Sequence, residues 1–330
     1  MEHVPLVSIV IPTYNYSHFI CEAIDSVLAS NFSSHNLEII VIDDGSTDDT
    51  ANKINLYKGR IKYISQNNSG KAWATKIGIE EARGKYIFNL DADDIFLPDK
   101  LQKVIDIFEQ DEDIVHVAYP ALCRNETHNI EKIEPIPKFI LDKKILGKEL
   151  LLYFYKRGIL FGGGSTFSAR SSVLKNIFIP KEVDMFIDEY LILATLTQGY
   201  SFFLSQPLSV WRIHDKNFSQ QRRSNSSREK LKRNFESIKA VSKNLSWMDL
   251  EPKMTILYQL KTKGLMLKIK EELEEKSISD IFDLWRFIFT HITTFGVEIF
   301  EIIKNYHIFN RTLPTFFLGF IRGIKTRLGE

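Results

Sequence analysis

Residues 88–99 read FNLDADDIFLPD, an apolar run that leads directly into three carboxylates within four residues. The run 86–90 has the composition of a buried strand, so Asp91, Asp93 and Asp94 should lie together at its end. Clustered carboxylates repel one another unless a positive group lies among them. Mg²⁺ and Mn²⁺ suit such a cluster, because they take a few protein oxygen ligands and complete their coordination with water and substrate phosphates. The alternative is that the aspartates only cap the turn and helix that follow.

Strand-like and helix-like runs alternate through the first half of the chain. Strands are expected over residues 6–12, 37–42, 60–65, 86–90 and 114–119. Helices are expected over residues 19–29, 71–82 and 98–110, with a further helix opening at a capping box in 46–49. This alternation is typical of βαβ units, so the sequence predicts an α/β fold with a mostly parallel sheet.

Polar residues follow three of the expected strands at their carboxyl ends, in segments 13–15, 43–44 and 91–94. Ligands of parallel α/β sheets bind outside the carboxyl ends of the strands, at a point where the strand order reverses. We therefore expect these three segments to meet at one edge of the sheet and to form the binding site.

The second half of the chain is less regular. The GGGST sequence of residues 162–166 predicts a flexible turn, with helices over 171–176 and 188–198 after it. A late strand is expected over 202–211, interrupted at Pro207. From residue 220 onward the pattern is helical. We expect a catalytic domain over residues 1–219 and a helical region over residues 220–330.

Composition narrows the class of protein. The 330 residues carry a formal net charge of +1, so no overall field favours nucleic acid or an acidic partner. Two cysteines, Cys21 and Cys123, are too few for a disulfide framework and indicate a reducing compartment. The first residues lack the basic region and cleavage site of a signal peptide, so a cytoplasmic location is expected.

Two classes of metal-dependent enzyme use an aspartate cluster of this kind. In phosphatases that form an aspartyl phosphate, Asp91 would be the nucleophile and Asp93 the acid. Their cluster follows the first strand, however, whereas this one follows the fourth and continues into Asp94. In nucleotide-diphospho-sugar transferases the metal stabilises the leaving diphosphate. That class also gives Asp43 and Tyr14 a role beside a nucleobase, and it is consistent with the lack of a glycine-rich phosphate loop after any strand.

Six segments taken in order resemble the family 2 glycosyltransferases of the GT-A fold. They are VSIVIPTYN (7–15), VIDDGSTDDT (41–50), GKYIFNLDADDIFLPDKL (84–101), GGGSTF (162–167), IDEYLI (187–192) and WRIH (211–214). The resemblance covers roughly residues 5–219. It implies a Rossmann-like mixed sheet flanked by helices, and it leaves the helical region of residues 220–330 as a C-terminal extension.

The resemblance also implies site residues. Donor-binding positions are Pro12, Thr13, Tyr14, Asn15, Asp43, Asn68, Gly70, Lys76, Asp91, Ala92 and Asp93. A divalent metal, Mn²⁺ or Mg²⁺, would be held by Asp93, Asp94 and His214. The catalytic base would come from the acidic pair that opens a helix. By position the base is Glu189, with Asp188 as the alternative, because the two residue types are swapped relative to the usual order.

The implied activity is inverting, metal-dependent transfer of a hexosyl or N-acetylhexosaminyl group. The expected donor is a UDP-sugar, and the expected acceptor is a hydroxyl of a glycan, glycolipid or polyol phosphate in cell-surface polysaccharide synthesis. Many relatives carry Arg and Asn where this chain has Thr75 and Lys76, so Lys76 is expected to supply the missing positive charge. That departure and the swapped acidic pair also motivate a rival reading, a non-catalytic nucleotide-sugar-binding or scaffold protein of the same fold.

The C-terminal region has two distinctive stretches. A basic stretch runs from Arg222 to Arg233 without interleaved aromatic residues, so we expect a solvated surface rather than a nucleic-acid site. The longest uncharged run in the aromatic segment, 287–297, is too short to span a bilayer. The apolar run 313–321 precedes several cations, which suits peripheral contact with an anionic membrane surface. Packing on the catalytic domain and an oligomer interface are the alternatives.

Overall fold

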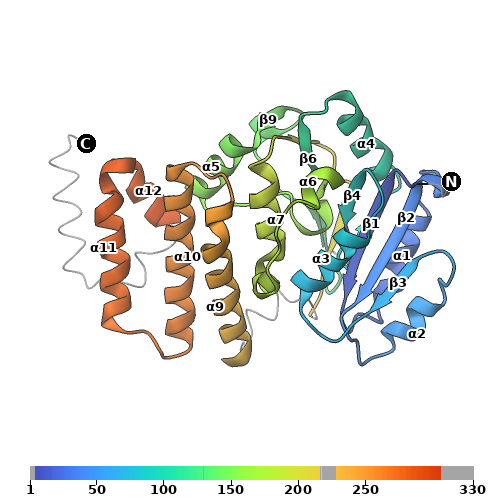
Figure 1. Ribbon diagram of the computed structural model, residues 1–330, viewed down its shortest axis with the longest axis horizontal. Coiled ribbons are helices and arrows are strands. Elements are labelled where there is room, and N and C mark those ends of the chain that lie inside the picture. The colour runs from blue at the N-terminus through green and yellow to red at the C-terminus, as the bar shows by residue number, and fades with distance from the viewer. Residues whose placement is uncertain (1–3, 129, 216, 218–227, 306–330) are drawn as a thin grey trace. The chain divides into compact units, whose positions relative to one another are not determined.

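The computed structural model describes residues 4–128, 130–215, 217 and 228–305. It divides into two compact units, one made of Met1–Leu151 with Leu160–Leu250 and the other of Leu152–Ile159 with Glu251–Glu330. Within the described ranges, the first unit holds all the strands and the second is helical (Figure 1).

The main sheet of the first unit has eight strands. Across the sheet they lie in the order β3 (Lys62–Ser65), β2 (Leu37–Asp43), β1 (Val7–Thr13), β4 (Tyr86–Asn89), β10 (Ser168–Arg170), β6 (Ile114–Ala118), β11 (Tyr200–Phe203) and β9 (Lys144–Leu146). Strands β1 to β4 are parallel, as the alternating pattern predicted. β10 runs antiparallel between β4 and β6, and β9 runs antiparallel to β11. The sheet is therefore mixed, as the GT-A resemblance implied.

Helices cover both faces of this sheet. Successive strand side chains point to opposite faces, so Ile9 and Ile11 of β1 face away from Val10. Ile9 and Ile11 belong to a core that includes the buried stripes of α1 (Ile20–Leu28) and α4 (Lys100–Gln110). On the other face, Gly78 of α3 (Lys71–Glu81) lies against Val10. β1 is buried along its whole length, in keeping with a sequence that is apolar except at Ser8 and Thr13.

A second, smaller sheet has four strands. Their order is β5 (Ile95–Phe96), β12 (Ser209–Ile213), β7 (Leu122–Asn125) and β8 (Ile130–Ile133). The late strand expected over 202–211 is interrupted around Pro207, as predicted, but its two parts belong to different sheets. Around Pro207 the chain leaves the main sheet after β11 and enters the smaller sheet as β12.

Most predicted helices form, with shifted ends. The helix expected from residue 98 begins at Lys100, and α6 (Ser171–Leu174) and α7 (Ile187–Leu196) lie where helices were predicted. The capping box expected in 46–49 is wrong. The Ser46 hydroxyl accepts from the Asn15 N–H, and α2 (Thr50–Asn55) begins four residues later, where Asp48 accepts from the Thr50 N–H.

The first unit extends further along the chain than the expected boundary at 219. It includes α9 (Arg228–Lys243), which packs on the short helical segment η4 (Lys181–Phe186). An ion pair between Arg233 and Asp184 joins these two elements. Other short elements of the first unit are η1 (Ser34–Asn36), η2 (Lys138–Ile140), η3 (Gly164–Thr166) and η5 (Asn244–Trp247).

The second unit contains the end of α5 (Gly147–Arg157) together with α10 (Pro252–Glu272), α11 (Ile278–Phe295) and α12 (Glu298–Asn305). α10 and α11 lie side by side (Figure 1). Ser277 and Asp280 form a capping box at the start of α11. None of the helices in the described ranges is both long and apolar enough to cross a bilayer. The apolar run 313–321 lies outside the described residues.

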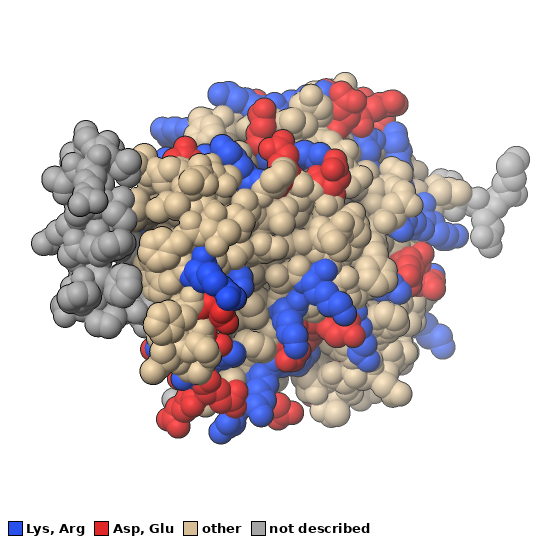
Figure 2. Space-filling model, turned by 60° about the vertical axis from the view of Figure 1, so that its left-hand side comes forward, with Lys and Arg blue, Asp and Glu red and all other residues tan. Residues whose placement is uncertain are grey.

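Charges of both signs are interspersed on the surface. On the face shown in Figure 2, Lys and Arg side chains lie among Asp and Glu side chains around an uncharged central area. That face has no extended patch of one sign, in keeping with the formal net charge of +1.

Candidate active site

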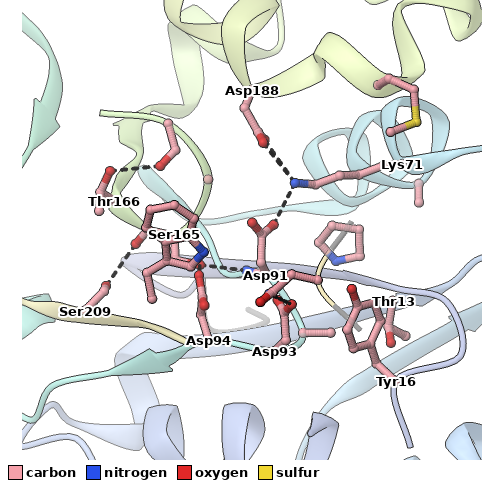
Figure 3. Close-up of a pocket in the computed structure, with 18 of the residues that line it drawn as sticks. Thr13, Tyr16, Lys71, Asp91, Asp93, Asp94, Ser165, Thr166, Asp188 and Ser209 are labelled. Carbon is pink, nitrogen blue, oxygen red and sulfur yellow. Dashed lines mark hydrogen bonds and ion pairs between the residues drawn. The ribbon is translucent and has the colours of Figure 1, made fainter. Parts of the chain in front are cut away.

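A cavity of about 560 Å³ opens within the first unit, at the carboxyl ends of β1 and β4. Figure 3 shows residues that line it. The structure brings the predicted segments together there, since Pro12, Thr13 and Tyr14 line the cavity with all four residues from Asp91 to Asp94. Asn68 lines it as well.

Two predicted donor residues shape the adjoining loops instead. Asp43 is buried at the end of β2, where it accepts from the Ser46 N–H at 2.8 Å and from the Tyr63 hydroxyl at 2.9 Å. The Asn15 side chain accepts from the Thr47 N–H at 2.7 Å, and its φ of 57° is the left-handed conformation that Asn tolerates. Neither residue lines the cavity.

Asp44, which the sequence placed at this edge of the sheet without a donor-binding role, does line the cavity. Its carboxylate accepts from the N–H groups of Ser69 and Gly70, each at 2.7 Å, and from the Gln66 amide at 2.6 Å. These bonds hold the loop before α3 against the end of β2. Gly70 has φ +93°, a conformation that favours glycine.

The three aspartates have different surroundings. Asp94 is buried, and its two oxygens accept from the Ser165 hydroxyl at 2.5 Å and the Arg212 N–H at 3.1 Å. Burial raises the pKa of Asp94 well above its ordinary value, and the neighbouring carboxylates add to the effect. Both oxygens of Asp94 are thus engaged by the protein, which makes it a weaker candidate for a metal ligand than Asp93.

Asp93 lies beside His214, with 3.3 Å between its Oδ2 and the histidine Nε2. The Asn217 amide donates to the same oxygen at 3.0 Å. The His214 ring stacks on Phe19 with its centroid at 4.3 Å, and its Nδ1 is buried without a hydrogen-bond partner in the described part of the chain. Tyr16 lines the cavity nearby, and burial together with Asp93 raises the pKa of its phenol.

Lys71 connects two carboxylates across the cavity (Figure 3). Its ammonium lies 2.8 Å from Asp91 Oδ1 and 3.0 Å from Asp188 Oδ2. These carboxylates raise the pKa of Lys71 against the opposing effect of burial. Burial raises the pKa of Asp91 to about 6, although the Lys71 ammonium opposes the shift.

The predicted cation Lys76 does not line the cavity. Its ammonium pairs with Glu80 at 3.1 Å and lies 4.3 Å from the Trp73 ring centroid. Lys71 and Lys76 are five residues apart on α3, which at about 100° per residue places them on different sides of the helix. Of the two lysines on α3, Lys71 is therefore the one that brings its charge to the cavity.

The two acidic residues at the start of α7 also differ in whether they line the cavity. Asp188 lines the cavity and contacts Lys71, whereas Glu189 is not among the lining residues. Adjacent helical residues point about 100° apart, so one member of the pair faces the cavity. The geometry favours Asp188 over Glu189 as the group that can reach a ligand.

The loop 162–166 closes the cavity opposite α3. The Ser165 carbonyl accepts from the Lys100 ammonium, the Tyr119 hydroxyl and the Ser209 hydroxyl, each at 2.9 Å. Lys100 is fully buried, and burial lowers its pKa well below the ordinary value. Gly164 has φ +52°, and a Cβ atom built there would lie 3.0 Å from Asp91 Oδ2, so a glycine is needed at this position.

Arg233 of α9 is a second cation at the cavity and was not predicted as a site residue. Its Nε pairs with Asp184, which also lines the cavity. The sequence offered no spacing that would link these two residues, because they meet only when α9 packs on η4.

Asp93 and His214 are the side chains predicted to bind a divalent metal that the structure places next to each other. Within the described residues, no group of three or more His, Cys, Asp or Glu side chains forms a complete metal site. Asp93 and His214 are adjacent, and Mg²⁺ is commonly held by one or two protein carboxylates with water and substrate phosphates. Asp93, which lines the cavity, therefore fits a metal that takes its remaining ligands from a bound substrate. His214 is not among the lining residues and lies beside this position through its contact with Asp93.

The chain is similar to known proteins in sequence and in fold. The family model Glycosyl transferase family 2 matches residues 8–178. An uncharacterized glycosyltransferase of Nostoc is 30% identical over 223 residues, which cover 64% of this chain and 66% of the relative. The match covers 44% of the length of an uncharacterized glycosyltransferase of Rickettsia prowazekii and 66% of the length of the Nostoc relative, so the chain spans less than two thirds of each.

Two solved structures have a similar fold. The S. aureus TarS 1–349 structure in complex with UDP-GlcNAc superimposes with a TM-score of 0.61 at 16% identity, covering 91% of this chain and 89% of TarS 1–349. The mannosyltransferase PcManGT of Pyrobaculum calidifontis, in complex with GDP-Man and Mn²⁺, gives a TM-score of 0.53 at 14% identity over 92% of this chain and 86% of the other. At these identities the similarity establishes the fold alone.

Proposed function

The chain belongs to glycosyl transferase family 2, and from this premise we propose that it transfers a hexosyl or N-acetylhexosaminyl group from a UDP-sugar, with inversion, to an acceptor hydroxyl. The observation that carries the proposal is the placement of Asp188 across one cavity from the aspartate cluster, with Lys71 in contact with both Asp188 and Asp91. This arrangement gives one site for a donor and, facing it, a candidate base.

In this proposal the donor nucleotide lies against Pro12, Thr13, Tyr14 and Asn68, at the end of the cavity next to β1 and α3. Asn15, Asp43 and Gly70, which were also predicted as donor residues, act on the shape of the site through the hydrogen bonds and backbone conformations described above. Ala92 contributes to the cavity wall between the aspartates.

The charge of the cavity supports a metal cofactor. Among the described residues, two cations, Lys71 and Arg233, line it together with seven acidic side chains: Asp44, Asp91, Asp93, Asp94, Glu134, Asp184 and Asp188. A nucleotide diphosphate would add further negative charge, so its binding needs an additional cation. Asp93 and His214 would hold a Mg²⁺ or Mn²⁺ ion, which when bound neutralises charge on the diphosphate. The solved mannosyltransferase complex contains Mn²⁺.

The chemical role of Asp188 follows from its position. Its carboxylate would accept the proton of an acceptor hydroxyl while the hydroxyl oxygen forms a bond to the anomeric carbon of the donor. The bond from that carbon to the diphosphate breaks on the opposite face of the sugar, and the configuration inverts. Lys71 would hold Asp188 directed at the cavity during this step.

The acceptor belongs to the proposal as well. We assign a glycan, glycolipid or polyol phosphate of a cell-surface polymer, on the basis of the family and of the open cavity next to Asp188. The TarS 1–349 structure is a complex with UDP-GlcNAc and the PcManGT structure a complex with GDP-Man, so both nucleotides belong in the test.

Peripheral contact with an anionic membrane surface is a further part of the proposal. Ile278, Phe282 and Phe289 of α11 are exposed, and their helical spacing places them along one stripe. Sedimentation with anionic vesicles tests this contact. We expect Phe282→Asp to reduce the bound fraction, and equal sedimentation of the variant and the wild-type protein would rule out this stripe as the contact.

Thermal unfolding with a panel of nucleotides tests the donor site. UDP with Mg²⁺ or Mn²⁺ at about 100 times its Kd should stabilise the protein by ~2.7 kcal/mol, and the stabilisation should require the metal. Asp93→Ala should abolish the shift, whereas Asp106→Ala, on the exposed side of α4, should preserve it. If no nucleotide gives a metal-dependent shift, the donor site proposed here is wrong. Binding without any transfer would favour the non-catalytic alternative.

A further inference from the structure

The smaller sheet has one buried face and one face that reaches the cavity. On β12, Ser209 and Trp211 point to the same side, and Val210 and Arg212 point to the opposite side. Val210 is 1% exposed and Arg212 3%, whereas Trp211 is 40% exposed. An indole with this much solvent exposure is accessible to a ligand, and Trp211 is one of the residues that line the cavity.

Strand register extends this face across the sheet. Trp211 of β12 is paired with Cys123 of β7, and Cys123 is paired with Lys132 of β8, so the three side chains share one side. Ala121 and Glu134 continue the same two strands, with the Glu134 N–H donating to the Ala121 carbonyl at 2.8 Å. By the two-residue alternation, both lie on the face that carries Trp211.

Glu134 is held in place at the rim of the cavity. One of its oxygens, Oε2, accepts from the Ala121 N–H at 3.0 Å, and the residue is part of the cavity lining. A carboxylate fixed by the backbone in this way presents a preformed acceptor for hydroxyl groups. Trp211 thus offers a flat apolar surface, Glu134 offers a hydrogen-bond acceptor held in a fixed position, and both line the same cavity.

The topology separates this face from the nucleotide end of the cavity. The residues assigned to the nucleotide follow β1 or precede α3, on one side of β4 in the sheet order. Ala121 follows β6, which lies on the other side of β4 beyond β10. The aspartates at the end of β4 lie between the two ends. A molecule on the Trp211 face would therefore approach the donor sugar from the side opposite the nucleotide.

We propose that this face, defined by Trp211, Glu134 and their neighbours Cys123 and Lys132, is the acceptor subsite and that it binds a pyranose ring of a glycan. The indole would stack on the C–H face of the ring, and Glu134 would accept from its hydroxyls. A lipid chain is a poorer match, because a charged residue lies on this face at Lys132 and another at Glu134. The assignment rests on the proposed function, since it names the acceptor class of that site.

Sugar binding without donor or metal tests the subsite directly. Saturation-transfer NMR would measure the Kd values of methyl β-D-glucopyranoside, methyl β-N-acetylglucosaminide, maltotriose and chitotriose as probes. For at least one probe, Trp211→Ala should raise Kd about tenfold or more, and Trp211→Phe should stay within about threefold because it keeps an aromatic face. Glu134→Gln should raise Kd by a smaller factor. Trp73→Ala, a truncation on α3 outside the cavity lining, is the control and should bind the probe as the wild type does.

The proposal would be overturned if the wild-type protein bound none of the probes, or if Trp211→Ala bound them equally well. A parallel loss of UDP affinity in that variant would also overturn it, because it would place Trp211 in the donor site. Binding of glycerol 3-phosphate that depends on Lys132 and not on Trp211 would also contradict it. Failure of the proposed function has a different signature. In that case the wild-type protein binds the sugar through Trp211 but forms no transfer product with any nucleotide sugar.

Discussion

The Lys71 ammonium lies 3.0 Å from the Asp188 carboxylate, which joins the first turn of α3 to the first turn of α7. The two residues are 117 positions apart in the chain. Because Lys71 also contacts Asp91 at 2.8 Å, it fixes the candidate base relative to the aspartate cluster.

Replacement of Lys71 tests this link. Lys71→Met should lower kcat about 100-fold, equivalent to ~2.7 kcal/mol in the activation barrier, since Asp188 loses the group that directs it. Lys71→Arg should recover part of the loss, because it keeps the charge. Lys76→Met should remain within about twofold of the wild type, since Lys76 does not line the cavity. Steady-state kinetics would measure all three, and a larger effect at Lys76 would restore the sequence-based assignment.

The choice between the two acidic residues of α7 is equally testable. Asp188→Asn should reduce kcat by about 10² to 10⁴, the usual range for loss of a general base, with nucleotide affinity retained. Glu189→Gln should change kcat by no more than about threefold. The account would be contradicted by the reverse pattern, in which Glu189→Gln is inactive and Asp188→Asn is not.

Several parts of this architecture were accessible from the sequence. The strands β1 to β4 and the meeting of their polar ends followed from the alternation of apolar runs, which is a local property. The antiparallel β10 and the transfer of β12 into the smaller sheet were not predicted, because they depend on pairings between distant segments.

The sequence-based assignments that the geometry does not favour have a related cause. Lys76 was assigned from its place in a family pattern, but the direction of each side chain on α3 is set by how that helix lies on Val10. The preference for Glu189 over Asp188 has the same origin, since one residue of helical register turns a side chain by about 100°. Arg233 reaches the cavity only through the packing of α9 on η4, which no local pattern encodes.

Stability should fall in mild acid because of His116. This residue is fully buried, with Nδ1 2.8 Å from the Ser201 hydroxyl, and burial lowers its pKa to about 4. The unfolded chain takes up a proton near pH 6.5 and the folded chain near pH 4, so the unfolded state binds more protons between these values. Because of His116, the free energy of unfolding should therefore fall by about 2 kcal/mol when the pH is lowered from 7 to 5.

Urea unfolding at the two pH values would measure this contribution, with His116→Gln as the variant that does not titrate. The wild-type protein should lose ~2 kcal/mol more than the variant on going from pH 7 to pH 5. Equal losses would show that His116 is not the group responsible.

Gly164 provides a separate test of the 162–166 loop. Gly164→Ala places a Cβ atom at φ +52° and 3.0 Å from Asp91 Oδ2, so the loop or the aspartate must shift. We expect a loss of about 1–2 kcal/mol in unfolding free energy from the backbone conformation. Activity should fall further than this loss alone accounts for, because Asp91 moves relative to Lys71. Denaturant unfolding and kinetics on the same preparation would separate the two effects, and unchanged activity would rule out a role for this close contact.

The most direct test of the central claim is the stereochemistry of donor hydrolysis, followed in real time by ¹H NMR with an α-linked UDP-sugar and Mg²⁺. In the absence of an acceptor, water takes the place of the attacking hydroxyl. If Asp188 directs an inverting displacement, the β-anomer of the free sugar forms first, and Asp188→Asn abolishes its formation. Initial release of the α-anomer, or hydrolysis that is undiminished in Asp188→Asn, would contradict the account.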